Sequence, residues 1–159
     1  MFFPLFVDLS GKEILVVGAG TIASRRIRTL CDFSKKITVI APEVTPEVRE
    51  LAELRRVKLQ RRRFEMTDLE GKDMVLAATD DDGLNQAIAE KCRALGIPVN
   101  SSSNQALCDF QFPSVVQDGD VVIGLNASGK NHRLVKETRK KVEQCLQVTD
   151  KDSKYKDSK

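Results

Sequence analysis

Residues 12–26 read KEILVVGAGTIASRR, and this stretch joins a short apolar run to a Gly-x-Gly-x-x-Ala turn. The run Ile14–Val17 is typical of a buried strand in a parallel sheet. In the turn, Gly18 permits a tight bend, Gly20 lets the backbone approach a pyrophosphate, and Ala23 lets the next helix pack closely on the strand. A purely structural turn would also explain three small residues at this spacing. Because the turn stands between a strand and an amphipathic helix, the stretch predicts the phosphate-binding start of a dinucleotide-binding fold.

The length and charge of the chain describe one domain with room for a small appendage. The 159 residues are enough to bury a core but do not leave space for a second full enzyme domain. The net charge of +3 is modest and does not require a nucleic acid partner. The opening residues 1–7 are apolar but are interrupted by Pro4. We therefore expect neither a signal peptide nor a membrane anchor.

The cysteines and the histidine bear on compartment and on metal binding. Four cysteines are scattered without a Cys-x-x-Cys pair: Cys31, Cys92, Cys108 and Cys145. This pattern argues against a zinc site or a secreted disulfide framework and favours free thiols in a reducing compartment. His132 is the only histidine, so a histidine cluster for a metal cannot form. We expect a cytoplasmic protein without a metal site.

The apolar segments alternate between strand and helix patterns. Strands are predicted at residues 13–17, 37–41, 57–60, 73–78 and 97–100, with helices between most of them. Such alternation is typical of an α/β fold with a Rossmann-type parallel sheet.

Helix boundaries are marked by capping residues. The first helix is expected over residues 21–33, with a buried stripe of Ile22, Ala23, Ile27 and Leu30. Thr45 is a good N-cap for the second helix, and Pro46 suits its first position. The third helix is expected over residues 83–95, with Gly96 as a left-handed C-cap.

The pattern changes after Asn100, where residues 101–105 are polar and loop-like. We assign residues 1–104 to the Rossmann domain. Residues 105–148 are expected to form a small α+β region, with a hairpin turning at Asp118-Gly119 and then a basic helix over about 131–147. The charged residues 149–159 are expected to be disordered.

Six short motifs between Phe3 and Leu146 are more specific than the glycine turn. They are residues 3–9 (FPLFVDL), residues 17–23 (VGAGTIA) with Arg25-Arg26, residues 77–81 (AATDD), Val99-Asn100, residues 110–114 (FQFPS) and residues 127–130 (ASGK). Taken together, they make the chain resemble the precorrin-2 dehydrogenases of sirohaem biosynthesis, including the amino-terminal module of multifunctional sirohaem synthases. The resemblance implies an NAD-dependent oxidation of precorrin-2 to sirohydrochlorin. It also implies a homodimer whose dimerisation region, here residues 105–148, helps to build the active site.

The cofactor site follows from the turn and from the strand ends. Glu43 lies about 20 residues beyond the glycines, where a carboxylate can accept hydrogen bonds from ribose hydroxyls and disfavour a 2′-phosphate. NAD is therefore expected rather than NADP, although a solvated carboxylate at the helix entrance would explain Glu43 equally well. Asp81 or Asp82 would cap the next helix. The expected cofactor-binding residues are Gly18, Gly20, Thr21, Ile22, Pro42, Glu43, Thr79 and Asp80.

A tetrapyrrole substrate with several carboxylates would be attracted by positive charge. The expected substrate-binding residues are Arg25, Arg26, Asn100, Lys130 and Arg133, although each charged side chain would also be at home on a solvated surface. The run Arg61-Arg62-Arg63 has no aromatic stacking residues beside it, so nucleic acid binding is not expected.

The chain departs from the family pattern after Val99-Asn100. Many members of the family carry an aspartate, proposed as the acid/base residue, at the position where this chain has Ser103. A serine is a poor general base, so proton acceptance would fall to Asn104, Asp109, water or the substrate carboxylates. Dehydrogenation can survive this change. The iron insertion that bifunctional relatives perform is put in greater doubt, and we expect no ferrochelatase activity. A second departure is that the carboxyl-terminal helical region of many relatives is cut short here after Gln147.

Two interpretations from different classes remain open. One is the NAD-dependent dehydrogenase working as a homodimer, with Ser103 at the catalytic position. The other is a non-catalytic dinucleotide- or tetrapyrrole-binding protein with a regulatory or carrier role. A generic NAD-binding module of an ion transporter would share the glycines but would not explain residues 110–114 followed by the hairpin.

Overall fold

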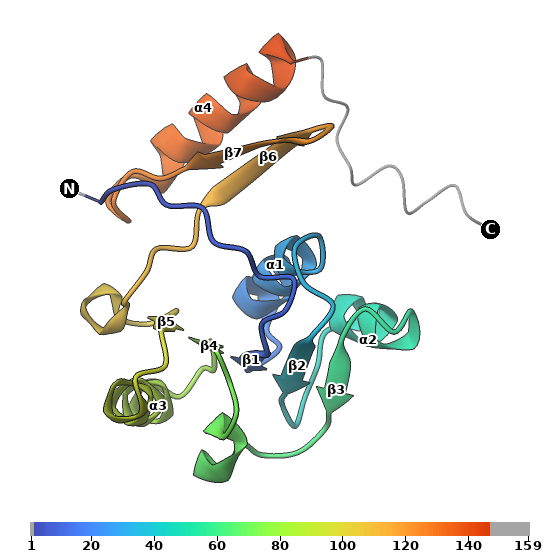
Figure 1. Ribbon diagram of the computed structural model, residues 1–159, viewed down its shortest axis with the longest axis vertical. Helices are drawn as coiled ribbons and strands as arrows, with labels where there is room; N and C mark the ends of the chain where they lie inside the picture. The colour runs from blue at the N-terminus through green and yellow to red at the C-terminus, as the bar shows by residue number, and fades with distance from the viewer. Residues whose placement is uncertain (1, 147–159) are drawn as a thin grey trace. The chain divides into compact units, whose positions relative to one another are not determined.

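The computed structural model describes residues 2–146 (Figure 1). The chain forms two compact units: the larger is Leu5–Gln111, and the smaller combines the first residues, up to Pro4, with the chain from Phe112 onward. None of the helices within residues 2–146 is both long and apolar enough to cross a membrane. The predicted tail, residues 149–159, lies outside the described residues.

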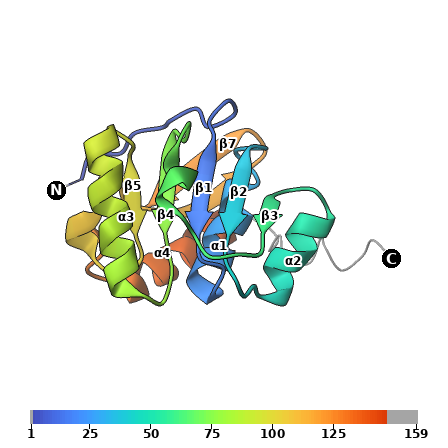
Figure 2. The same ribbon diagram turned by 90° about the horizontal axis from the view of Figure 1, so that it is seen from below.

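The larger unit is built on a parallel five-stranded sheet with the strand order β3-β2-β1-β4-β5. The strands are β1 (Ile14–Val17), β2 (Ile37–Ile40), β3 (Lys58–Gln60), β4 (Met74–Ala77) and β5 (Val99–Ser101). The connections contain the helices α1 (Thr21–Leu30), α2 (Pro46–Glu53) and α3 (Asp82–Leu95), and the short 3₁₀ helices η1 (Met66–Leu69) and η2 (Gln105–Leu107). α1 and α3 cover opposite faces of the sheet (Figure 1 and Figure 2). The predicted Rossmann-type α/β fold is confirmed.

The core surrounds the central strand β1, whose four side chains are at most 1% exposed. Ile88 and Cys92 of α3 pack in one cluster with side chains of β1, β4 and β5. Strands that are covered on both faces bury every side chain, so their sequences are continuous apolar runs. This is why Ile14–Val17 could be recognised as a strand without an alternating pattern.

The buried side of α1 differs from the prediction in its first turn. Three of the expected core residues are buried: Ala23, Ile27 and Leu30. Ile22 is 48% exposed, so its assignment to the buried stripe was wrong. Ser24 is buried instead, and its hydroxyl donates to the Gly20 carbonyl at 2.9 Å and lies 2.7 Å from the Thr45 hydroxyl. The first turn of α1 follows directly on the edge of the sheet, where strand side chains cannot cover Ile22.

The predicted helix caps are confirmed at α2 and α3. The Thr45 hydroxyl accepts a hydrogen bond from the Val48 N–H at 3.4 Å, at the start of α2. The Asp81 carboxylate accepts one from the Leu84 N–H at 2.9 Å, at the start of α3. Gly96 ends α3 with a φ of +70°. α1 ends at Leu30, earlier than the predicted residue 33.

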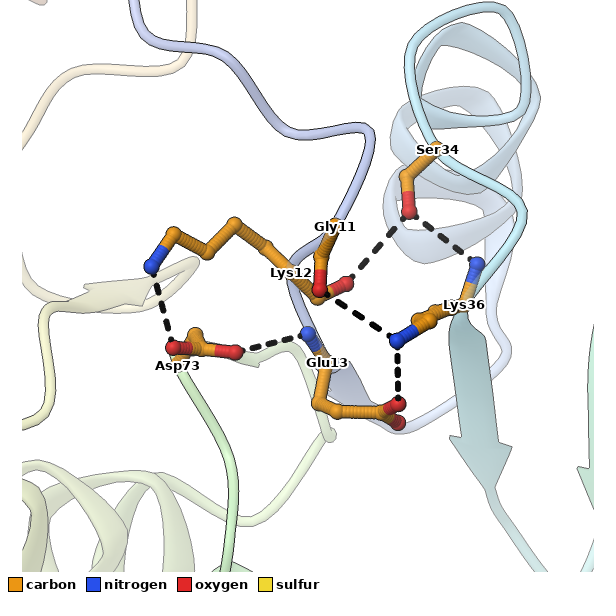
Figure 3. Close-up of polar contacts among 6 residues, drawn as sticks. All are labelled: Gly11, Lys12, Glu13, Ser34, Lys36 and Asp73. Carbon is orange, nitrogen blue, oxygen red and sulfur yellow. Dashed lines mark hydrogen bonds and ion pairs between the residues drawn. The ribbon is translucent and has the colours of Figure 1, made fainter.

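A polar cluster ties together the amino ends of β1, β2 and β4 (Figure 3). The Asp73 carboxylate accepts hydrogen bonds from Lys12 Nζ at 3.2 Å and from the Glu13 N–H at 2.9 Å. Lys36 Nζ lies 3.4 Å from Glu13 Oε1 and 3.4 Å from the Gly11 carbonyl. These contacts fix the strand starts at the edge opposite to the one where the cofactor residues are expected.

Within residues 112–146, the smaller unit contains a hairpin and one helix. Strands β6 (Ser114–Asp118) and β7 (Val121–Leu125) pair antiparallel, and Gly119 in the turn between them has a φ of +55°. The helix α4 (His132–Cys145) packs on both strands. Its N-cap is Asn131, whose side chain accepts a hydrogen bond from the Leu134 N–H at 2.9 Å. The small antiparallel region predicted after the parallel sheet is therefore present.

The structure divides the chain between Gln111 and Phe112. The connection after β5 stays with the larger unit because its backbone returns to that strand. The Asp109 N–H donates to the Val99 carbonyl at 2.9 Å, and Asn100 Nδ2 donates to the Phe110 carbonyl at 2.7 Å. The division expected from the sequence, after residue 104, falls inside this connection.

Candidate dinucleotide site

The loops that leave the carboxyl ends of β1, β2, β4 and β5 all lie along one edge of the sheet. The strand order reverses between β1 and β4, because the chain returns to the middle of the sheet after β3. Open α/β sheets bind their ligands outside the carboxyl ends of the strands, at such a switch point. The cofactor residues expected from the sequence come from these loops.

Gly18 brings the loop after β1 against the loop after β4. Its φ is +100°, and a Cβ on it would lie 2.2 Å from the Ala78 carbonyl oxygen. The Gly18 N–H donates to the Ile40 carbonyl at 2.9 Å, and the Ala78 N–H donates to the Val17 carbonyl at 2.8 Å. Only glycine satisfies both the conformation and the space, so Gly18 sets the bend of the turn.

Gly20 leaves the start of α1 open. It is the N-cap of the helix, no side chain caps the first N–H groups, and the first turn contains no acidic residue. A Cβ on Gly20 would meet nothing within 4 Å. Thr21 and Ile22 in that first turn are exposed. Uncapped N–H groups beside open space, at the positive end of a ten-residue helix, fit a bound pyrophosphate.

The loop after β2 is anchored next to the glycine turn. The Thr45 N–H donates to the Ala19 carbonyl at 3.3 Å, and the Ala41 N–H donates to the Gln60 carbonyl at 3.2 Å. Pro42 and Glu43 lie between these two anchors, and both are exposed. An exposed carboxylate at this position fits hydrogen bonding to the ribose hydroxyls of a dinucleotide.

Thr79 and Asp80 follow β4, and Asp80 is exposed. Thr79 is held by a residue that the sequence reasoning missed, Asn85 of α3, which is 0% exposed. Asn85 Oδ1 accepts hydrogen bonds from the Thr79 N–H at 3.1 Å and from the Thr79 hydroxyl at 2.8 Å. The sequence contains a signal for this role, because Asn85 is a polar residue at a core position of α3. It stands three and seven residues before Ile88 and Cys92, on the apolar stripe of the helix.

Ser103 follows β5 and lies within reach of the same amide. Its Oγ is 3.3 Å from Asn85 Nδ2 and 3.2 Å from Ser101 Oγ. The side chains of Asp109 and Asn104, two other candidate proton acceptors, each accept a hydrogen bond from a backbone N–H. Asp109 Oδ2 accepts from the Val99 N–H at 2.9 Å, and Asn104 Oδ1 accepts from the Ala106 N–H at 2.9 Å.

Two of the expected substrate-binding residues are brought together across the larger unit. Arg26 of α1 donates to Asn100 Oδ1 of β5 at 2.7 Å. Burial lowers the pKa of the Arg26 guanidinium, which stays charged at neutral pH. Arg25, the next residue back on α1, is exposed. Lys130 and Arg133 belong to the smaller unit, are exposed, and Arg133 forms an ion pair with Glu137 at 2.8 Å.

The basic run and the cysteines have structural explanations. Arg62 forms two hydrogen bonds with Asp68, at 2.8 and 2.5 Å, which lower the pKa of that carboxyl group.

All four cysteines are free thiols, and burial raises the pKa of Cys92 to about 11. Within residues 2–146 no group of three or more histidine, cysteine, aspartate or glutamate side chains could hold a metal ion.

A parallel sheet with this switch point, and a glycine turn opening on a bare helix N-terminus, define a dinucleotide-binding protein of the Rossmann type. The chain belongs to the family described as "Putative NAD(P)-binding", whose model matches residues 5–114. A nicotinamide dinucleotide is therefore its cofactor.

Comparisons with single proteins are more specific. The chain is 37% identical over 144 residues to "Siroheme synthase" of Psychrobacter sp. (strain PRwf-1), which covers 91% of this chain and 30% of that protein. It is 37% identical over 148 residues to "Siroheme synthase" of Ectopseudomonas mendocina (strain ymp), covering 93% of this chain and 32% of that protein. The chain thus spans about a third of the length of the curated relatives it matches.

A solved structure named "SirC, precorrin-2 dehydrogenase" superposes with a TM-score of 0.73 at 26% identity, covering 91% of this chain and 71% of that one. The resemblance inferred from the six sequence motifs is confirmed by these matches.

Proposed function

We propose that the chain is an NAD-dependent dehydrogenase that oxidises precorrin-2 to sirohydrochlorin in tetrapyrrole biosynthesis. The observation that carries the proposal is the match to SirC, which extends over 91% of this chain and therefore includes both units. The two sirohaem synthases match over 91% and 93% of this chain.

The oxidation removes one hydride and one proton from the tetrapyrrole, and bound NAD supplies the hydride acceptor. The chain itself binds and orients. We assign the pyrophosphate to the turn and first helical residues Gly18, Gly20, Thr21 and Ile22. Pro42 and Glu43 would contact the adenosine ribose, and Thr79 and Asp80 would lie beside the nicotinamide half. The exposed Glu43 carboxylate supports NAD over NADP, because a 2′-phosphate would be repelled there.

Positive charge and amide groups would bind the substrate carboxylates. We assign this role to Arg25, Arg26, Asn100, Lys130 and Arg133. Arg26 and Asn100 are hydrogen-bonded to each other.

We also propose a homodimer that works in the cytoplasm, built through the smaller unit and without nucleic acid or membrane partners.

The proton would pass to water or to a carboxylate of the substrate. Ser103 occupies the position at which many members of the family carry an aspartate, but a neutral hydroxyl group is too weak a base to accept a further proton at neutral pH. Iron insertion must remove protons from pyrrole nitrogens, and the residues Ser101–Ser103 contain no base for this step. We therefore propose that the chain lacks ferrochelatase activity.

The test is anaerobic incubation of the purified chain with precorrin-2, with NAD and NADP in separate samples. We expect the reduced nicotinamide and sirohydrochlorin spectra to rise together with NAD and far more slowly with NADP. Binding of both ligands without turnover would support the alternative, a carrier or regulatory protein. The second sample set adds Fe²⁺ to sirohydrochlorin, where no acceleration over the buffer control is expected.

A further inference from the structure

The side chain of Asn85 uses all of its hydrogen-bonding capacity inside the larger unit. It is 0% exposed, and it joins the loop after β4 to the loop after β5. Its Oδ1 accepts from the Thr79 N–H at 3.1 Å and from the Thr79 hydroxyl at 2.8 Å. Its Nδ2 donates to the Thr79 carbonyl at 3.0 Å and to Ser103 Oγ at 3.3 Å.

The orientation of this amide is fixed by chemistry. A backbone N–H can only donate, so the atom facing the Thr79 N–H must be the amide oxygen. A backbone carbonyl can only accept, so the atom facing the Thr79 carbonyl must be the amide nitrogen. The second hydrogen of that nitrogen is then directed at Ser103 Oγ, because Nδ2 has no other partner within residues 2–146.

Ser103 is therefore an acceptor on its inner side, and its own hydrogen must point elsewhere. Ser101 Oγ, at 3.2 Å, already accepts a long bond from the Ser103 N–H at 3.4 Å and is free to donate its own hydrogen to Ser103. Either hydroxyl can be the donor in the hydrogen bond between Ser101 Oγ and Ser103 Oγ. When Ser101 donates, the exposed Ser103 directs its own hydrogen outward, along the edge of the sheet where the ligand would bind.

We propose that Asn85 is a positioning residue that holds Ser103 as a hydrogen-bond donor towards an acceptor oxygen of the bound ligand. The position that carries a carboxylate in many relatives would then act here by donating a hydrogen bond. The acceptor is a carbonyl or carboxylate oxygen, either the carboxamide of the nicotinamide or a carboxylate of the tetrapyrrole. The inference rests on the proposed function for the identity of these two ligands.

The first experiment measures ligand binding without turnover. We titrate NAD and, separately, sirohydrochlorin into the wild-type chain, Ser103→Ala and Ser103→Thr. Removal of one donor should weaken one of the two ligands by about threefold to tenfold, and Ser103→Thr, which keeps the hydroxyl, should restore binding. The ligand that weakens identifies the acceptor. Unchanged dissociation constants for both ligands in Ser103→Ala would overturn the inference.

The second experiment tests the role of Asn85. Asn85→Asp keeps an acceptor for the Thr79 N–H and hydroxyl but replaces the donor that faces both the Thr79 carbonyl and Ser103 with an oxygen, so the Ser103 hydrogen would turn inward. Asn85→Asp should weaken the same ligand as Ser103→Ala, and the double variant should be no weaker than Ser103→Ala. Gln86→Glu, one residue further along α3 and exposed, is the control for the added charge. Equal weakening in Gln86→Glu would contradict a role through Ser103.

A third readout does not depend on the stability of the Asn85 variant. The side-chain amide of Asn85 gives a pair of ¹⁵N-correlated proton resonances, and Ser103→Ala should shift the one that donates to Ser103. An unchanged pair would show that the contact does not exist in solution. A wild-type chain that binds NAD but no tetrapyrrole would refute the proposed function and leave the NAD titration to decide the inference.

Discussion

The two glycines of the turn act in different ways. Gly18 is needed for its backbone, since a Cβ would lie 2.2 Å from the Ala78 oxygen at a φ of +100°. Gly20 has an ordinary extended conformation, with a φ of −75° and a ψ of −174°, and open space around it. Gly20 is needed because a side chain at this position would exclude a phosphate group from the start of the helix.

Gly20→Asp should abolish NAD binding while keeping the fold. Aspartate is a favourable N-cap, so the midpoint of urea unfolding should stay the same or rise slightly. The same carboxylate would repel the pyrophosphate, and the NAD dissociation constant should rise by roughly a hundredfold or more. Calorimetric titration measures the loss. Gly11→Asp is the matched control, because Gly11 also has nothing within 4 Å of an added Cβ but lies at the opposite edge of the sheet. Unchanged NAD affinity in Gly20→Asp would exclude the proposed pyrophosphate site.

Thiol labelling should follow burial rather than position in the sequence. Cys31 and Cys92 are buried, and burial raises the pKa of both thiols, so each forms the reactive thiolate less readily than an exposed thiol does. Cys145 is exposed on α4. With a disulfide reagent, Cys145 should react first, and Cys31 and Cys92 should react only after unfolding in urea. Mass spectrometry of the labelled peptides gives the order, and fast labelling of Cys92 in the native chain would contradict the packing of α3.

At the level of the elements, a feature could be predicted from the sequence where it depends on residues close together in the chain. The apolar run of β1, the Thr45 cap and the Gly96 cap all depend on neighbouring residues, and each was predicted. The role of Asn85 depends on residues 79 and 103, which no helical periodicity brings together. Ile22 was placed in the core because periodicity does not reveal where the sheet ends. Tertiary position decided both cases.

The strand starts depend on Asp73, and this makes stability depend on pH. The backbone N–H of Glu13 and the Lys12 side chain, both hydrogen-bonded to the carboxylate, hold the pKa of Asp73 below its ordinary value. A group with a lowered folded pKa stabilises the native state above its unfolded pKa, and this contribution is lost as pH falls through the folded pKa. Asp73→Asn should therefore destabilise the chain at pH 7 and much less near pH 2. Urea unfolding at the two pH values measures the difference. An equal effect at both would assign the loss to packing.

At the scale of the whole molecule, the described part of the smaller unit, which ends at residue 146, is a hairpin packed on the helix α4. Val121 and Leu134 in it are 58% and 51% exposed. A second copy of this unit packed on these side chains would remove them from water, which favours association. Sedimentation equilibrium should give about twice the mass of the chain at micromolar concentration. A monomer that still turns over precorrin-2 would contradict the proposed homodimer.

The fold class and the dinucleotide cofactor could be predicted because glycine spacing and strand order report on backbone geometry. The substrate residues could not be predicted with the same precision. Arg26 and Asn100 meet only through the packing of α1 and β5, and Lys130 and Arg133 belong to a separate unit. Their part in binding stays a prediction.

The most direct test of the central claim is a single anaerobic turnover with the chain in excess over precorrin-2 and with NAD present. Reduced nicotinamide and sirohydrochlorin are quantified in the same sample. The dehydrogenase predicts equal amounts of the two products, each equal to the precorrin-2 supplied. Sirohydrochlorin without reduced nicotinamide, or bound ligands with neither product, would contradict it.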